Sequence, residues 1–151
     1  MNPPGAFSSA ITGMALGEQV GYANFGAGHH AILWRGTPES AVDMHPPWLF
    51  GVSELRATCG SAQVGVVQGG TAGIWFGTPG SFVDLAQFLP SGYGASVATS
   101  VAELNGTFYV GGYAYRAGTL DREAILWIGI PAPASAPVLL AAGVLAWRRR
   151  R

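Results

Sequence analysis

Apolar positions along residues 8–130 alternate with polar or small ones in short stretches, and glycine or proline separates these stretches. A period of two that is broken by turn residues predicts β-strands rather than helices. The alternation is clearest in residues 10–16, 52–58 and 96–104, and shorter apolar stretches follow each of them. No strong helical period precedes Pro131. The pattern therefore predicts an all-β body.

One sequence unit occurs three times in this body. A Val-Gly step at Val20, Val64 and Val110 gives spacings of 44 and 46 residues, and each step is followed by an apolar stretch with a tryptophan. About 45 residues and four strands are typical of one propeller blade. We therefore expect about three four-stranded, propeller-like blades, an incomplete propeller, followed by a short C-terminal apolar helix.

The three repeated tryptophans are predicted to pack between neighbouring blades, because one blade cannot bury both of its faces. These residues are Trp34, Trp75 and Trp127. Closed propellers have about 4–8 blades, so three blades alone are expected to expose two blade faces. The chain is then the end of a longer product, an open stack, or a protomer that closes by association. The first alternative, a chain truncated at its N-terminus, is favoured.

The net charge of zero comes from two unlike parts of the chain. All eight basic residues are arginines and four of them are the last four residues, so residues 1–147 carry four positive against eight negative charges, a net of −4. Hydrophobic residues make up 49% of the chain, which excludes the composition of a disordered protein. An acidic body lacks the basic patch that nucleic acid requires. No nucleic-acid partner is therefore expected.

Candidate chemistry is sparse in the repeats. His29, His30 and His45 are the histidines, and adjacent histidines can bind metal. Because the matching positions of the other two copies are not histidine, we expect loop residues rather than a metal site. Asp43 and Asp84 recur after a predicted strand and are expected to accept backbone N–H groups in a turn. Calcium ligation is the alternative for these two aspartates.

The remaining polar positions fit turns or surface. Cys59 is the one cysteine, so no intrachain disulfide forms and a small buried side chain is expected. Asn105-Gly106 predicts a hairpin turn. The longest loop between predicted strands contains Arg116, Asp121, Arg122 and Glu123. We expect this loop to be a solvated hairpin tip, and a binding site for a partner is the alternative. The sequence thus predicts no catalytic, cofactor or metal site, and a protein that is not an enzyme.

The last 21 residues have a different composition. No charged residue lies between Ile125 and Trp147, and prolines prevent a regular helix through residue 137. A helix over residues 138–147 is about 15 Å long, half of a ~30 Å hydrocarbon core. The predicted membrane segment contains Val138, Leu139, Leu140, Val144, Leu145 and Trp147, and the predicted cytoplasmic anchor is Arg148, Arg149, Arg150 and Arg151.

The energetics of this segment favour a membrane by a small margin. Its five Val and Leu residues contribute roughly −2 kcal/mol of insertion, and each arginine near an anionic leaflet adds about 1 kcal/mol. The positive-inside rule places the arginines in the cytoplasm and the repeats outside. The alternative is a helix that packs on the sheet and has a solvated basic end.

Two resemblances carry the functional expectation. The repeats resemble the HAF family of bacterial extracellular repeats, which pair a Gln-Val-Gly stretch with a His-Ala-Phe-Leu-Trp stretch and a following Asp-Leu. Here the first copy reads Gln19-Val20-Gly21, His30-Ala31-Ile32-Leu33-Trp34 and Val42-Asp43-Met44. The resemblance covers about residues 8–130 and implies a propeller-like β fold without a catalytic assignment.

The tail is similar to the PEP-CTERM sorting signal of Gram-negative bacteria, in which a short proline motif precedes an apolar helix and an arginine cluster. The proline motif here is Pro131, Ala132, Pro133, Ala134 and Ser135, a Pro-Ala-Pro variant like those of planctomycete proteins. The resemblance implies export, recognition by an exosortase-like processing enzyme, cleavage near the proline motif, and delivery to the cell surface. The N-terminus shows no signal peptide.

The sequence thus predicts two parts, a β-repeat domain over residues 1–130 and a sorting and membrane-anchor segment over residues 131–151. The leading hypothesis is a non-enzymatic, exported surface protein that is first anchored in the inner membrane, with a surface glycan or a protein as its unidentified ligand. One alternative is the C-terminal fragment of a propeller enzyme, or of a glycan-binding protein, whose active part lies upstream. Another is a degenerate reading frame without a stable product.

Overall fold

The computed structural model describes residues 1–129 and the backbone of Val144–Ala146. The chain is all-β, as predicted. The first sheet contains β1 (Ser8–Ala15), β2 (Glu18–Asn24), β3 (His29–Trp34) and β4 (Val42–Asp43); the second contains β5 (Ser53–Thr58), β6 (Gln63–Val67), β7 (Thr71–Trp75) and β8 (Val83–Asp84). The third contains β9 (Tyr93–Leu104), β10 (Thr107–Arg116), β11 (Arg122–Ile128) and the short β12 (Val144–Ala146). Single 3-10 turns occur at Pro38–Ser40, Pro79–Ser81 and Ala86–Phe88.

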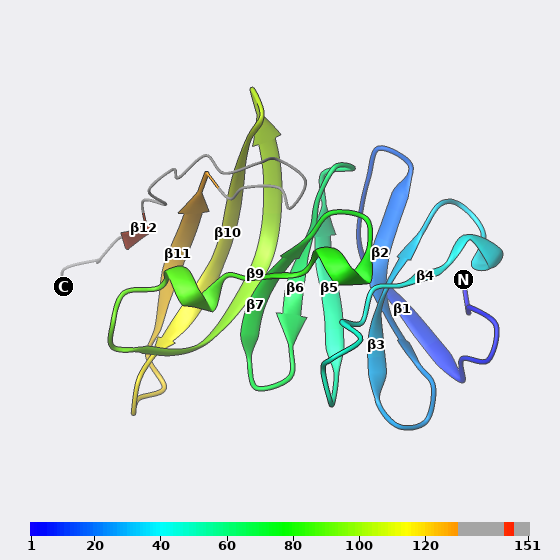
Figure 1. The fold of residues 1–151 in the computed structure, drawn as a ribbon, viewed down its shortest axis with the longest axis horizontal. Coiled ribbons are helices and arrows are strands. Elements are labelled where there is room, and N and C mark those ends of the chain that lie inside the picture. Colours follow the sequence, from blue (N-terminus) through cyan, green and yellow to red (C-terminus); the bar gives the residue numbers. More distant parts are fainter. Residues whose placement is uncertain (130–143, 147–151) are drawn as a thin grey trace.

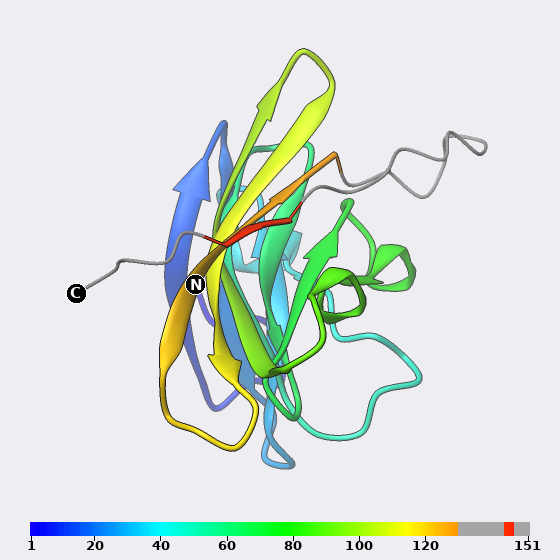
Figure 2. The ribbon, with the colours of Figure 1, turned by 90° about the vertical axis from the view of Figure 1, so that its left-hand side faces the viewer.

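Each sheet is an antiparallel meander, and the three sheets form an open row with the second sheet in the middle (Figure 1). The first strand of a sheet packs against the preceding sheet: β5 contacts β1, β2 and β3, and β9 contacts β5, β6 and β7. The view turned by 90° shows β12 running along β11 (Figure 2). Three antiparallel sheets are therefore shown, whereas closure into a ring is not.

Two apolar layers hold the row together, one on each face of the second sheet. The side chains of adjacent β7 residues pack into opposite layers, because side chains alternate between the two faces of a strand. Trp75 belongs to the layer against the first sheet, with Leu33 and Met44, and Ile74 belongs to the layer against the third sheet, with Trp127. All five side chains are at most 1% exposed. The middle sheet is thus buried on both faces.

The outer face of the first sheet is also covered, which differs from the expectation of two exposed blade faces. Ile32 and Trp34 on this face are 1% and 0% exposed. Ala6 from the N-terminal segment and Phe25 from the β2–β3 turn pack against them. The chain therefore closes this end of the row with its own residues. Trp34 belongs to this end cluster, whereas Trp75 and Trp127 lie between sheets.

A glycine of the second strand lies against a bulge of the first strand in every sheet. A Cβ on Gly21, Gly65 or Gly112 would lie 1.9, 1.9 or 2.1 Å from a carbonyl oxygen of the neighbouring strand. The pairing register shifts by one residue beside each of these glycines. Only glycine fits such a close backbone approach. The repeated glycine is therefore a packing requirement of the bulge.

The third copy of the repeat is aligned differently in the structure than in the sequence. Trp34 pairs with Gln19 and Trp75 pairs with Gln63, but Trp127 pairs with Val110. Val110 therefore occupies the glutamine position, and Gly112 rather than Gly111 matches Gly21 and Gly65. The Val110-Gly111 match is one residue out of register, because either of two adjacent glycines can be aligned in the sequence alone.

The expected C-terminal helix is wrong for Val144–Ala146. These residues form β12 and pair antiparallel with Ile125–Trp127 of β11, in the place that β4 and β8 occupy in the other two sheets. The edge of β11 offers unpaired backbone groups, and an extended apolar segment can pair with it. The rest of the predicted tail, including Val138, Leu139, Leu140, Trp147 and the four arginines, lies outside the described residues.

We expect Gly112→Ala to destabilise the protein by about 2–3 kcal/mol, because its Cβ would overlap a backbone carbonyl that cannot move freely. Gly111→Ala is the matched control, since its Cβ would meet only the Ser100 hydroxyl, which can rotate away. Urea unfolding of both variants measures the difference. Equal losses at the two positions would show that the register assigned to the third copy is wrong.

Candidate functional site

The recurrent glutamines bind the turn that follows the tryptophan. The side-chain oxygen of Gln19 accepts the backbone N–H of Gly36 at 2.9 Å, and Gln63 accepts that of Gly77 at the same distance. Gln63 is fully buried, so its amide needs partners inside the protein. The glutamine of the Gln-Val-Gly stretch thus holds the third strand of its sheet at its C-terminal end.

A serine that the sequence analysis missed organises the same turn. Ser40 accepts the N–H of Arg35 at 2.7 Å and donates to the carbonyl of Thr37 at 2.6 Å. Ser81 makes the corresponding bonds in the second sheet. The signal was present in the sequence, because both serines lie six residues after the tryptophan in a Gly-Thr-Pro-x-Ser stretch.

Two further serines join one sheet to the next. Ser53 of β5 accepts the backbone N–H of Ala31 at 2.9 Å, and Ser96 of β9 accepts that of Ala72 at 3.2 Å. Both serines are at most 1% exposed. The alanine three residues before the tryptophan therefore donates its N–H across the interface in both cases. This bond could be found only with the sheets in place, since 22 or 24 residues separate the partners.

The recurrent aspartates close turns, as predicted. Asp43 accepts the N–H of His45 at 2.8 Å, and Asp84 accepts the N–H of Ala86 at 2.7 Å. Asp43 also accepts from His30, with 2.8 Å between Nδ1 and Oδ2. The second carboxylate oxygen of Asp43 therefore ties β4 to β3.

His30 and His45 form a polar chain between the first and second sheets. Their rings stack with centroids 4.1 Å apart. Nε2 of His45 lies 3.0 Å from the Leu49 carbonyl, which can only accept, so Nε2 carries the proton. Nδ1 then accepts from the Ser53 hydroxyl at 2.8 Å. His29 and His30 lie in strand β3 rather than in the expected loop, and His29 packs against Tyr22. Among residues 1–129 no group of three potential ligands could hold a metal ion.

Glu18 is a buried carboxylate at the first inter-sheet contact. It is 7% exposed, and its two oxygens lie 2.9 Å from donors on Arg35, Thr58 and Gln63. Arg35 comes from the first sheet, whereas the other two donors belong to the second. A buried charge is tolerated only when it is paired and hydrogen-bonded. Glu18 therefore locks the two sheets together at the hairpin end of β2.

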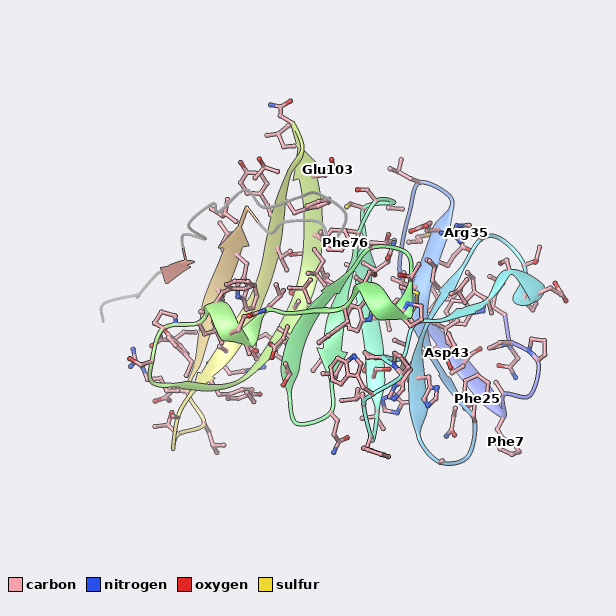
Figure 3. All side chains as sticks on the ribbon, viewed as in Figure 1. Phe7, Phe25, Arg35, Asp43, Phe76 and Glu103 are labelled. Atoms are coloured by element: carbon pink, nitrogen blue, oxygen red, sulfur yellow. The ribbon has the colours of Figure 1, made fainter. Side chains whose placement is uncertain are left out.

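A groove of about 500 Å³ lies beside this contact. It lies between the three tips that join β1 to β2, β5 to β6 and β9 to β10. Glu103 marks this edge at the top of Figure 3, well away from Asp43. The groove is lined by Ala15, Leu16, Thr58, Cys59, Val101, Ala102, Glu103 and Asn105. Cys59 is half-buried here, and Asn105 forms the expected hairpin turn with Gly106.

The predicted polar hairpin tip is smaller than expected. Arg116 is the last residue of β10, and Arg122 and Glu123 belong to β11, so only residues 117–121 connect the strands. Nε of Arg116 lies 2.8 Å from the Glu123 carboxylate, which also accepts from the Tyr93 hydroxyl. Arg122 lies over the Tyr113 ring, 5.3 Å from its centroid. The charges of this hairpin are therefore mostly paired within the third sheet.

The predicted sorting motif Pro131–Ser135 and the predicted anchor Arg148–Arg151 lie outside the described residues. Within the described part of the chain, no helix has the length and apolar character that crossing a membrane needs. The fold defines an all-β protein built from three antiparallel sheets, of which the first two repeat the same glutamine, serine and aspartate contacts. Comparison of the chain with protein-family models, curated proteins and solved structures finds no match.

We expect Glu18→Ala to lower the free energy of unfolding by about 3 kcal/mol, because Gln63, Thr58 and Arg35 lose a shared buried acceptor. Glu39→Ala removes the same charge from an exposed position and should change stability by less than about 0.5 kcal/mol. Urea unfolding compares the two variants. A loss no larger for Glu18→Ala than for Glu39→Ala would refute the role of Glu18 in joining the sheets.

Glu123 raises the pKa of Tyr93 above its ordinary value, chiefly by accepting the phenol hydrogen bond, with burial and the Glu123 charge adding to this and Arg116 opposing it. The raised pKa means that Tyr93 stabilises the fold below pH 10 and that this contribution disappears as the pH rises through the raised value. Glu123→Gln should therefore lower the pKa of Tyr93. A pH titration of the phenolate absorbance measures the pKa of Tyr93, with Tyr93→Phe as the reference. An unchanged pKa in Glu123→Gln would contradict the role of Glu123 in raising it.

Proposed function

We propose that this chain is a non-enzymatic β-repeat protein of the bacterial cell surface. The observation that supports this proposal is that the repeated polar side chains bind backbone groups of the fold. Gln19 and Gln63, Ser40 and Ser81, and Asp43 and Asp84 each bind a backbone group in the same place of their sheets, and Ser53 and Ser96 bind across the sheet interfaces. The repeated residues thus stabilise the fold. We propose that residues 1–130 act as a propeller-like module for surface structure or adhesion.

Under the proposal, the C-terminal tail determines that the module is exported and anchored in the inner membrane. Residues 138–147 insert into the inner membrane, Arg148–Arg151 remain in the cytoplasm, and an exosortase-like enzyme acts at Pro131–Ser135 during sorting. The apolar run and the arginine cluster both favour an anionic membrane. A helix through residues 138–147 and the β12 strand exclude each other, so membrane insertion requires β12 to leave the edge of β11.

We expect the full chain to partition into the membrane fraction and the double variant Leu139→Arg/Leu140→Arg to leave it. Each arginine at the centre of a membrane segment costs about 2.5–3.5 kcal/mol, more than the short apolar run provides. Phe50→Arg/Leu120→Arg adds the same charge at side chains that are 94% and 92% exposed, and it should stay in the membrane fraction. Fractionation and immunoblotting compare the three proteins.

Unchanged partitioning of the Leu139→Arg/Leu140→Arg protein would remove the membrane part of the proposal. Release of both double variants would show that added charge, rather than the tail, determines where the protein is found. Urea unfolding of the released protein checks that its sheets are intact.

A further inference from the structure

The three hairpin tips at one edge of the row leave the groove described above open to solvent. The tips between β1 and β2, β5 and β6, and β9 and β10 all lie at the upper edge of Figure 1. Thr58 and Cys59 line the groove from the middle sheet, with Leu16 on one side and Val101 and Asn105 on the other. The proposed surface function assigns no role to this groove.

Leu16 has a backbone conformation that leucine rarely adopts. It lies in a two-residue turn with φ of +49°, followed by Gly17 at +82°. The corresponding turn of the third sheet has Asn105 at +51° and Gly106 at +75°, which are the residue types that favour such turns. A left-handed conformation costs a branched apolar residue free energy that asparagine or glycine largely avoids. The leucine is therefore the strained member of the pair.

Burial does not compensate this strain. Leu16 is 86% exposed, although its side chain extends toward Gly60 of the neighbouring tip. Met14 and Leu104, on the two flanking hairpins, are 71% and 61% exposed. Strained backbone positions cluster at binding and active sites. The tips thus present apolar side chains that remain exposed in the described part of the chain.

The negative charge of the groove favours a cationic partner. Glu103 is the one charged residue among those that line it, and its carboxylate accepts a hydrogen bond from Ser61 of the neighbouring β5–β6 tip. The remaining oxygen positions of a carboxylate can accept from a guanidinium or ammonium group. Residues 1–129 carry four arginines against eight acidic residues, so the surrounding field also attracts a cation.

We propose that this groove binds a peptide segment in which apolar side chains adjoin an arginine or lysine. The apolar side chains pack on Leu16, Val101 and Ala102, and the cation pairs with Glu103. A groove of about 500 Å³ lies within the usual 300–1,000 Å³ of a ligand site. An anionic membrane surface fits less well, because the acidic groove would face acidic headgroups.

Two acetylated hexapeptides test the proposal on the full chain: one has four leucines flanked by arginines and the other has four leucines flanked by glutamates. NMR shifts of the backbone amides of Cys59, Val101, Ala102 and Asn105 report binding at the groove. We expect the arginine peptide to bind at least tenfold more tightly at low salt. Glu103→Gln should reduce that preference at least threefold, whereas Glu39→Gln, at an exposed site elsewhere, should leave it unchanged.

Leu16→Asn separates binding from folding. The substitution should weaken binding of the arginine peptide at least fivefold. It should also raise the urea midpoint of unfolding, because asparagine suits the left-handed turn. A purely structural leucine would give the reverse, a lower midpoint with unchanged binding. Leu120→Asn removes an equally exposed leucine from another loop and should change neither quantity.

Three results would overturn the proposal. The first is equal binding of the two peptides, or binding of neither. The second is Leu16-dependent binding to anionic vesicles, which would assign the tips to a lipid surface. The third is Leu16-dependent self-association in sedimentation, which would assign them to a second copy of the chain. None of these outcomes depends on the membrane tail, so the surface proposal is tested separately.

Discussion

Burial of both faces of the middle sheet is the constraint on which the structure depends. Ile74 and Trp75 are adjacent, point to opposite faces, and are both fully buried, so the second sheet needs a neighbour on each side. A four-stranded sheet cannot provide this burial alone. The two ends of the stack differ. Ala6 and Phe25 cover the outer face of the first sheet, whereas Leu126 and Tyr113 on the outer face of the third sheet are half-buried.

The repeated polar residues follow from that burial. When sheets pack closely, backbone N–H groups at the interfaces lose water and need internal partners. Ser53 and Ser96 supply them between the sheets, and Gln19 and Gln63 supply them at the turns. The bulged first strands demand glycine at the matching positions of the second strands. The bulge and its glycine thus recur in all three sheets, whereas the glutamine contact occurs in the first two.

The sequence predicts the strands, the repeat and the turns at Asp43, Asp84 and Asn105, because each depends on local alternation or turn chemistry. It fails where distant contacts decide the outcome. The bulge that separates Gly111 from Gly112 is set by the neighbouring strand, and part of the cover over Trp34 comes from Ala6, which lies 28 positions earlier. Groups such as Glu18, Thr58 and Gln63 become one site only after two sheets meet, so periodicity cannot reveal them.

The tail shows why local pattern alone does not choose between strand and helix. Val144 and Leu145 suit an apolar helix and an edge strand equally well, since valine and leucine occur in both. Pairing with β11 involves three residues, and each backbone hydrogen bond there contributes about 1 kcal/mol net. The proposed insertion contributes roughly 2 kcal/mol from the apolar run and about 1 kcal/mol per arginine. Under the proposal the membrane terms together exceed the pairing term, so insertion into an anionic membrane is expected to displace β12 from the edge of β11.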